Sequence, residues 1–285
     1  MRRNFTIASL VLALALALAL GVLGLAGCSP DDGATSGDTA SDELVVLKVG
    51  ASPTPHAEIL EQVAEDLAAE GYELEIIEYT DYVLPNTDVE AGEIDANYFQ
   101  HTPYLDDFNA ENGTSIVSAA SIHFEPLGLY AGKSASIDAL PEGGKVAVPN
   151  DATNEARALL LLEQEGVITL KADAGIKATV KDIAENPKNI EFIEVEAAAV
   201  PAMLADVDLA VINGNYALSA NLSVADALAS EASDGLAADT YANIVAVAEG
   251  NEDDAGIQAL VKVLTSEKIR TFIEQQYSGS VVAVF

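Results

Sequence analysis

Hydrophobic side chains recur with strand spacing and with helix spacing in turn, from residue 44 to the end of the chain. Residues 44–50 are rich in β-branched and aliphatic side chains and end at a glycine, which predicts a buried strand. Residues 58–70 predict a helix, and residues 73–78 predict the next strand. The apolar face of that helix consists of Ile59, Leu60, Val63 and Leu67. This order of elements predicts a right-handed crossover unit.

The same alternation continues through the rest of the chain. Further strands are predicted at residues 115–118, 128–131, 145–148, 190–195, 209–212 and 244–248. Further helices are predicted at residues 154–164, around 183–185, at 200–205 and at 253–276. The fold class that this pattern predicts is α/β throughout.

The first residues predict export. Arg2 and Arg3 precede an apolar stretch at residues 7–25, and small residues lead into Cys28. This pattern is typical of a secretory signal peptide, here residues 1–27. A permanent transmembrane helix is the alternative, since the stretch could cross a hydrocarbon core of roughly 30 Å. Leu-Ala-Gly-Cys resembles the lipobox of bacterial lipoproteins, which implies cleavage before Cys28 and a lipid anchor on it.

Two further observations agree with a lipid anchor. Cys28 is the only cysteine, and lipidation would consume a thiol that is otherwise free in an oxidising compartment. Residues 29–43 contain no aromatic residue and no aliphatic residue beyond alanine, so they cannot bury a core. Residues 28–43 are therefore predicted to form a flexible tether.

The charge of the chain excludes some partners. The 13 Lys and Arg residues face 46 Asp and Glu residues, a formal net charge of −33. Such an acidic chain is not expected to bind nucleic acid or anionic headgroups, because both require a positive surface. Half of the residues are apolar, which is enough for a large core in one large or two ordinary domains.

The sequence shows no signal for catalysis. It lacks a Gly-x-Ser-x-Gly elbow, a Walker loop and a dinucleotide-binding fingerprint. His56, His101 and His123 are scattered, without a cysteine or a second histidine at metal-ligand spacing. We therefore expect no enzyme activity, no metal and no cofactor.

Four segments rich in aromatic and amide residues, which we expect to lie in loops, have a specific likeness. They are residues 81–86, 94–105, 148–157 and 211–217. These segments closely resemble the methionine-binding lipoprotein family, the substrate-binding component of methionine ABC importers. Residues 49–60 and 185–189 resemble it as well, and the likeness covers the chain from Leu44 onward.

The resemblance implies a two-lobed periplasmic-binding-protein fold with a ligand cleft between the lobes. Lobe I would comprise residues 44–128 and 242–285, and lobe II residues 129–241. The function implied is capture of methionine, with L-methionine preferred, for the permease and ATPase of an ABC importer. The protein would be anchored to the outer leaflet of the bacterial cytoplasmic membrane.

Arg157 is the central candidate for ligand binding. It lies in the first turn of a predicted helix, where a cation meets the unfavourable end of the helix dipole. It could grip an amino-acid carboxylate as a fork, or it could form an ordinary ion pair with Glu155 or a neighbour. Asn154 could equally be only a helix N-cap. In the family, asparagines matching Asn154, Asn213 and Asn243 would contact the ligand.

A side-chain pocket is predicted from Tyr82, Phe99, His101, Tyr104 and Phe124. Aromatic rings accept a thioether well, and the alternative is ordinary core packing. Other functions remain open at this stage: an amino-acid-sensing or adhesive surface lipoprotein, or a protein that binds D-methionine or a methionine-containing dipeptide. The chain ends at Phe285, where many members of the family have a tryptophan.

Overall fold

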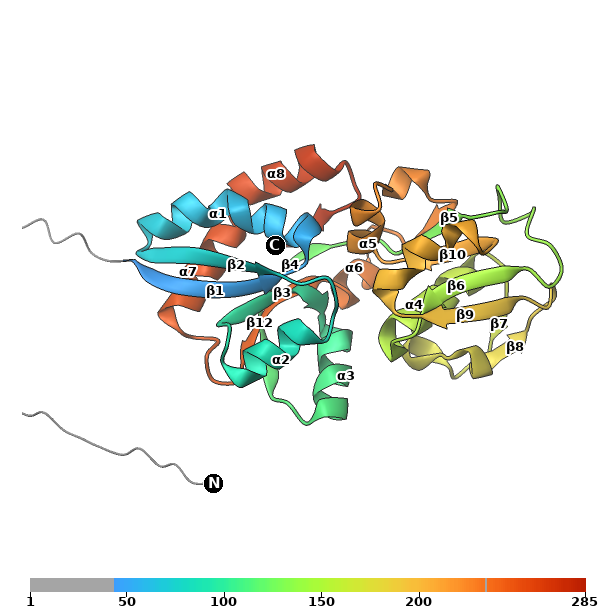
Figure 1. Ribbon diagram of the computed structural model, residues 1–285, viewed down its shortest axis with the longest axis horizontal. Helices are drawn as coiled ribbons and strands as arrows, with labels where there is room; N and C mark the ends of the chain where they lie inside the picture. The colour runs from blue at the N-terminus through green and yellow to red at the C-terminus, as the bar shows by residue number, and fades with distance from the viewer. Residues whose placement is uncertain (1–43, 234) are drawn as a thin grey trace, which may run out of the picture. The chain divides into compact units, whose positions relative to one another are not determined.

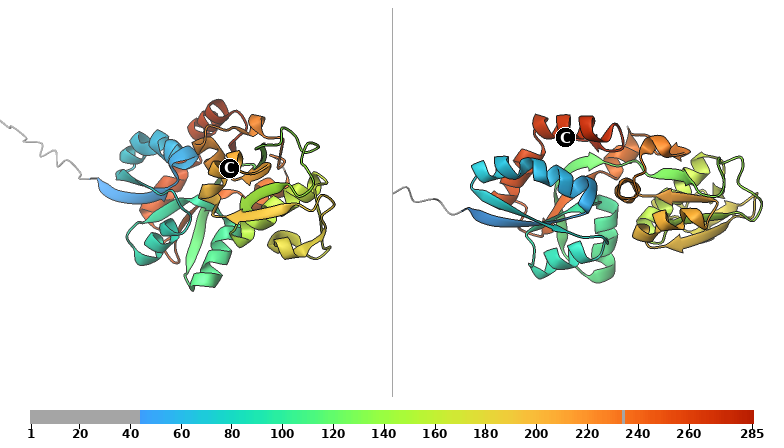
Figure 2. Two further views of the ribbon diagram at one scale, coloured as in Figure 1. Left: turned by 45° about the vertical axis from the view of Figure 1, so that its right-hand side comes forward. Right: turned by 45° about the horizontal axis from the view of Figure 1, so that its top comes forward.

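The computed structural model describes residues 44–233 and 235–285, in which two main β-sheets each carry their own helices (Figure 1). Each sheet with its helices forms one lobe, and both belong to a single compact unit. The two views in Figure 2 also show the lobes side by side. The predicted α/β, two-lobed architecture is confirmed.

Sheet A has six strands in the order β13-β4-β12-β3-β1-β2. They are β1 (Val45–Ala51), β2 (Tyr72–Glu78), β3 (Ala96–His101), β4 (Ile116–Phe124), β12 (Asn243–Ala248) and β13 (Val282–Ala283). Strand β1 is parallel to β2 and β3, whereas β12 runs antiparallel to β3 and β4. Because β12 follows β4 by more than a hundred residues, the chain leaves this sheet and returns to it.

Helices cover both faces of sheet A (Figure 1). One face packs against α1 (Glu58–Ala69), α7 (Ala255–Leu264) and α8 (Glu267–Tyr277). The other packs against α2 (Leu84–Ala91) and α3 (Thr102–Asn112). The predicted apolar face of α1 is confirmed, because its four side chains are fully buried in the larger of these cores. A π-helical turn, η1 (Pro53–Ala57), leads from β1 into α1.

Sheet B has five strands in the order β11-β5-β10-β6-β9. They are β5 (Gly128–Ala131), β6 (Lys145–Pro149), β9 (Glu191–Val195), β10 (Leu209–Ile212) and β11 (Ala229–Ser230). The longer helices that follow its strands are α4 (Ala152–Gln164) and α5 (Gly214–Ser219), and α6 (Leu236–Thr240) precedes β12. Short 3₁₀ helices lie at η2 (Gly175–Lys177), η3 (Val180–Asp182), η4 (Ala197–Ala205) and η5 (Val224–Asp226).

The chain passes between the two sheets twice. It leaves sheet A after β4 and enters sheet B at β5, and it returns between β11 and β12. Residues 125–127 and 231–242 make these two passages. Side chains on them therefore lie next to both lobes.

Three local predictions were wrong. Residues 183–185 form a strand, β8 (Ile183–Glu185), because they pair with β7 (Thr169–Leu170). The long helix predicted at 253–276 is two helices, since Ser266 has an extended backbone and begins α8. Residues 94–105 are not a loop: they contain β3 and the start of α3.

The predictions for the signal peptide, Cys28 and the tether concern residues 1–43, which lie outside the described residues. Within the described ranges, no helix is long and apolar enough to cross a membrane.

Candidate functional site

A small pocket lies between the two lobes. It is lined by Tyr82, Phe99, Gln100, His101, Tyr104, Glu125, Asn154, Arg157, Asn213, Gly214, Asn215 and Asn243. Eight of the nine predicted ligand-binding residues are in this set. Residues from both sheets and from the first passage between them therefore meet around one space.

Arg157 is buried beside the cavity, with 4% of its surface exposed. Its Nε donates to Glu231 Oε1 at 3.0 Å, and its Nη2 donates to Glu231 Oε2. Nη2 also donates to the backbone oxygen of Glu125 at 3.2 Å, and the guanidinium stacks on the Tyr241 ring at 4.3 Å. Burial would lower the pKa of Arg157, but Glu231, Tyr241 and Glu125 together outweigh it, so the pKa is raised and the group stays charged.

The partner of Arg157 is neither Glu155 nor an exposed group. Glu231 comes from the second passage between the sheets and is itself mostly buried. Its carboxylate covers one edge of the guanidinium. The remaining nitrogen, Nη1, lies 3.5 Å from Asn154 Oδ1 on the cavity side.

Asn154 is a hub of hydrogen bonds and not a cap. Helix α4 is capped by Asp151, whose side chain accepts from the Asn154 backbone nitrogen. The side-chain oxygen of Asn154 instead accepts from Asn213 Nδ2 at 2.8 Å and lies 3.2 Å from His101 Nε2. Asn154 thereby joins α4 to β3 in the opposite lobe.

Asn213 supplies an unused acceptor. It follows β10 directly and is the N-cap residue of α5. Because its Nδ2 donates to Asn154, its Oδ1 is fixed on the other side of the amide. In the part of the chain that the structure describes, this buried Oδ1 has no hydrogen-bond partner. Buried acceptors are usually satisfied, so a ligand with a donor would fit here.

Glu125 is a cavity residue that sequence reasoning missed. Its Oε1 accepts from His123 Nε2 at 2.7 Å and lies 3.4 Å from His56 Nε2. Burial raises the pKa of Glu125, whereas His56, the Asn215 backbone N–H and Arg157 act in the opposite direction. Gly214 packs directly on this carboxylate: a Cβ atom there would lie 2.8 Å from Oε2.

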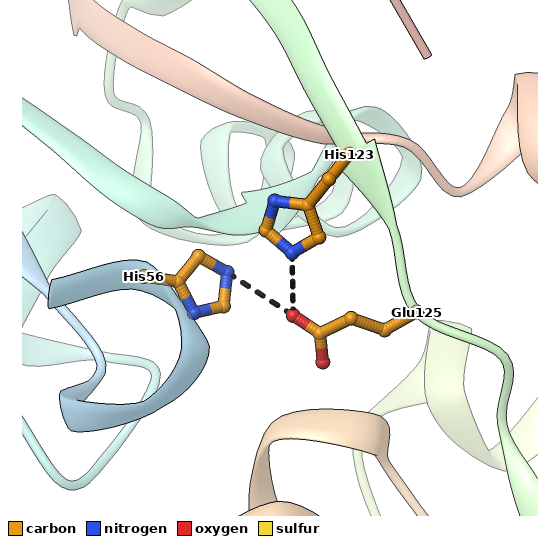
Figure 3. A group of neighbouring side chains, drawn as sticks. All are labelled: His56, His123 and Glu125. Carbon is orange, nitrogen blue, oxygen red and sulfur yellow. Dashed lines mark hydrogen bonds and ion pairs between the residues drawn. The ribbon is translucent and has the colours of Figure 1, made fainter. Parts of the chain in front are cut away.

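His56, His123 and Glu125 meet in three dimensions, so the expectation that the histidines are scattered was wrong (Figure 3). Their polar atoms lie within 4.8 Å of one another, which is close enough for a metal ion. Two ligand atoms of a tetrahedral zinc ion lie roughly 3.3 Å apart. The His123–Glu125 separation of 2.7 Å is instead that of a hydrogen bond. The group therefore fits a hydrogen-bonded carboxylate better than a metal site.

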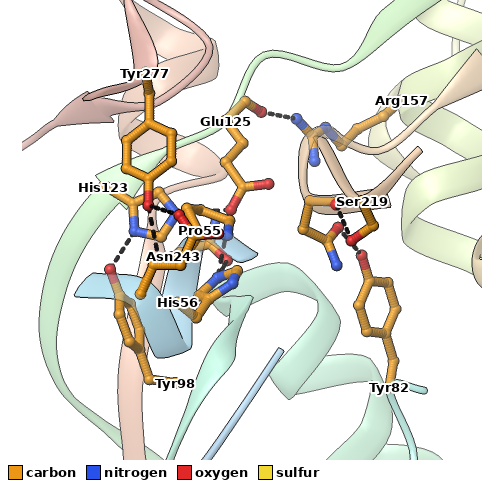
Figure 4. A network of polar contacts seen from close by, with 12 residues as sticks. Pro55, His56, Tyr82, Tyr98, His123, Glu125, Arg157, Ser219, Asn243 and Tyr277 are labelled. Atoms are coloured by element: carbon orange, nitrogen blue, oxygen red, sulfur yellow. Dashed lines mark hydrogen bonds and ion pairs between the residues drawn. The ribbon is translucent and has the colours of Figure 1, made fainter. Parts of the chain in front are cut away.

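Aromatic rings form another wall of the cavity. The ring centroid of Tyr82 is 5.6 Å from that of Phe99 and 5.7 Å from that of Tyr104. The Tyr82 hydroxyl donates to Asn215 Oδ1 at 2.6 Å across the two lobes, and Figure 4 shows Tyr82 facing the side that carries Arg157 and Ser219. Since its hydroxyl is engaged by protein, Tyr82 offers mainly its ring to a ligand.

His101 is held neutral in this wall. Its Nδ1 accepts from the Tyr104 backbone nitrogen at 3.1 Å, and its other ring nitrogen lies against Asn154. Burial lowers the pKa of His101 to about 3, and the charge of Arg157 acts in the same direction. The histidine is thus an uncharged donor at neutral pH.

The family match and the similar proteins agree. The model of the NlpA lipoprotein family matches residues 47–285. The methionine-binding lipoprotein MetQ of Bacillus subtilis is 40% identical over 265 residues, which cover 91% of this chain and 93% of the relative. This chain belongs to the NlpA lipoprotein family.

Two solved structures are similar to this chain. A lipoprotein from Ruminococcus gnavus is 57% identical, with a TM-score of 0.83 over 84% of this chain and 99% of the other. A nutrient-binding protein from Burkholderia cenocepacia, solved bound to methionine, is 46% identical. Its TM-score is 0.79 over 84% of this chain and all of the other. The family resemblance inferred from the sequence is confirmed.

One predicted ligand-binding residue lies away from the cavity. Phe124 ends β4 and packs in a small separate cluster with Ala238 and Tyr241. Its neighbours along the chain, His123 and Glu125, point to the opposite side and meet His56 there, as alternation along a strand requires. The signal that could have found Glu125 was this alternation beside His123.

Proposed function

We propose that this protein captures methionine between its two lobes and delivers it to the permease of an ABC importer, whose ATPase drives uptake. L-methionine is the preferred ligand in this proposal. The B. subtilis relative is named as a methionine-binding lipoprotein, and the B. cenocepacia structure is described as bound to methionine. A further solved relative, from Coxiella burnetii, is described as a periplasmic substrate-binding protein of an ABC transporter, which supports a binding role and not an enzymatic one.

One observation carries the proposal. The buried Asn213 Oδ1, without a partner among the described residues, lies in a cavity that also holds a guanidinium and a carboxylate. An α-amino acid carries one cation and one anion on neighbouring atoms. Its ammonium would donate to Asn213 Oδ1 and Glu125, and its carboxylate would accept from Arg157 Nη1. The opposite charges of the cavity thus match a zwitterion.

The remaining predicted residues would contact different parts of the ligand. Asn154, Asn243 and His101 would orient the ligand's polar groups, while Tyr82, Phe99 and Tyr104 would enclose its side chain. Sulfur beside an aromatic ring contributes about 0.3 to 1.5 kcal/mol beyond burial. A thioether side chain therefore fits this wall better than a charged one.

The lobe boundaries and the anchor are also proposed. Residues 44–128 with 242–285 would move against residues 129–241, and the passages at 125–127 and 231–242 would act as the hinge. This division is supported by the membership of the two sheets. Lipid on Cys28 would hold the protein at the outer leaflet of the cytoplasmic membrane, with residues 28–43 as tether.

The proposal is tested by identifying and titrating the ligand. Mass spectrometry of small molecules released from freshly purified protein is expected to find methionine. Calorimetric titration should show one site, and the melting temperature should rise with ligand concentration, by an amount equivalent to about 2.7 kcal/mol at a hundredfold excess over Kd. Saturating L-methionine that gives no binding heat and leaves the melting temperature unchanged would overturn the proposal.

The same experiments distinguish the alternative functions. Preference for D-methionine or a methionine-containing dipeptide would keep the fold and change the ligand. A bound amino acid without a cognate permease would indicate a sensing lipoprotein, and absence of any amino acid would favour an adhesive one.

A further inference from the structure

We propose that Tyr98 and His123, which do not line the cavity, control recognition of the ligand's amino group by holding Glu125 in place. The inference rests on the proposed function, because it concerns the same site. It assigns a role to a buried chain of hydrogen bonds that begins in the core of sheet A and ends at the cavity wall (Figure 4).

The contacts define which group donates and which accepts along this chain of hydrogen bonds. The Tyr98 hydroxyl contacts His123 Nδ1, and His123 Nε2 contacts Glu125 Oε1 at 2.7 Å. Among the described residues, His123 Nδ1 is the only acceptor recorded for the Tyr98 hydroxyl, so this hydroxyl donates to Nδ1. A neutral imidazole that accepts at Nδ1 carries its proton at Nε2. His123 therefore donates to the carboxylate.

His56 completes the arrangement from the other side. Its Nε2 lies 2.9 Å from Asn243 Oδ1 and 3.4 Å from Glu125 Oε1, and both are acceptors. Nε2 of His56 therefore also carries the proton. His123 thus donates to Oε1, whereas the N–H of His56 donates to Asn243 and lies beside the same oxygen.

The groups of this chain are deeply buried. Tyr98, His56 and His123 are fully buried, and Glu125 is almost so. Burial lowers the pKa of His123 to about 3 and that of His56 to about 4, so both rings are neutral at pH 7. A buried carboxylate without such donors would favour its neutral form. The ring N–H groups instead favour the anion, which is the form that binds an ammonium group.

The other oxygen of Glu125, Oε2, lies on the cavity side. Oε1 accepts from His123 and lies beside His56, whereas Oε2 lies beside Gly214, and a backbone hydrogen bond from Asn215 also holds the carboxylate. A carboxylate fixed by one oxygen presents the other in a constant position. Tyr98 and His123 are therefore positioning residues, and Glu125 is the group that touches the ligand.

The decisive variants are Tyr98→Phe and His123→Phe, with His123→Gln as a conservative rescue because its amide can still donate to Glu125. Tyr277→Phe is the matched control, since its buried hydroxyl donates to Glu58 and not to the chain. Each protein is titrated with methionine, with the deaminated analogue 4-(methylthio)butanoate and with methioninamide, which keeps the amine but loses the carboxylate.

Amine recognition is read from a ratio of affinities. Preference for methionine over the deaminated analogue should fall roughly three- to tenfold in Tyr98→Phe and roughly tenfold or more in His123→Phe. Preference for methionine over methioninamide should stay constant, because both ligands carry the amine. His123→Gln should recover part of the loss, and Tyr277→Phe should resemble wild type.

The pH profile gives a second readout. Methionine affinity should fall as Glu125 becomes protonated, and this fall should occur at higher pH in Tyr98→Phe and His123→Phe than in wild type. If His123→Phe does not fold, Tyr98→Phe alone decides the question. An unchanged ratio and an unchanged pH profile would overturn the inference while wild type still binds methionine. Wild type that binds no methionine would instead overturn the proposed function.

Discussion

Arg157 and Glu231 form a two-point ion pair between residues 74 positions apart in the chain. Glu231 Oε2 also accepts from the Leu127 backbone nitrogen at 2.9 Å, and the Glu231 backbone nitrogen donates to Leu127 oxygen. The two passages between the sheets are therefore joined at the residue that orients the guanidinium. Movement of one lobe against the other would therefore change the position of the Arg157 guanidinium.

Variants of this ion pair can separate the effect of Arg157 on ligand affinity from its effect on the stability of the fold. Arg157→Ala should weaken binding of every accepted amino acid roughly ten- to a hundredfold, since a charged hydrogen bond contributes about 1.5 to 3 kcal/mol. It should also destabilise the fold by roughly 3 kcal/mol, because Glu231 is left buried and unpaired. In the double variant Arg157→Ala/Glu231→Ala, stability should return and affinity should not. Urea unfolding and calorimetry measure the two effects, and recovered affinity in the double variant would contradict the carboxylate role.

Phe99 is expected to determine the preference of the site for the ligand's side chain. Phe99→Ala removes apolar contact from one wall of the cavity and leaves Arg157 untouched. Preference for methionine over alanine should therefore fall, while affinity for alanine itself changes little. Titration of wild type and variant with methionine, norleucine and alanine checks this division. An equal loss for all three ligands would show that Phe99 supports the whole site.

Buried His101 should make stability depend on pH. Its pKa is about 3 in the folded protein, whereas an exposed histidine has a pKa of about 6.5, so between these values only the unfolded chain binds the proton. This contribution is complete above pH 6.5 and is lost as pH falls, at about 1.4 kcal/mol per pH unit. The slope of unfolding free energy against pH between 6 and 4 should be smaller by that amount in His101→Gln. Urea titrations at several pH values test it, and parallel slopes would be the contrary result.

Cys28 is expected to be the lipid anchor. Cys28→Ser should abolish incorporation of labelled fatty acid and release the protein from the membrane, because this is the only thiol in the chain. Methionine affinity of the released protein should equal that of wild type. Label that persists on the serine variant would place the lipid elsewhere.

Local periodicity was enough to predict the elements that form one face of a core. The apolar positions of α1 repeat at helical spacing and are all buried. Local periodicity failed where tertiary contacts determine the secondary structure. Residues 183–185 are too short to define a period and become a strand by pairing with β7. Ser266 breaks a continuous helical pattern because it begins a second helix.

The site could be predicted only in part, for a physical reason. Arg157, Asn154 and Asn213 lie beside strand ends or helix starts, where a sequence already places cleft residues. Glu125 also follows a strand end, and only its alternation with His123 marks it, whereas Glu231 gave no such signal because its role depends on a partner 74 residues away. A chain with 46 acidic residues does not reveal which carboxylates are buried.

Gly214 leaves room for the Glu125 side chain. A side chain at this position would press against Glu125, with Cβ only 2.6 Å from the Glu125 Cβ. Even one methyl group there would displace the Glu125 side chain. Space that only a hydrogen atom at residue 214 leaves open is thus what allows the carboxylate to lie against the start of α5.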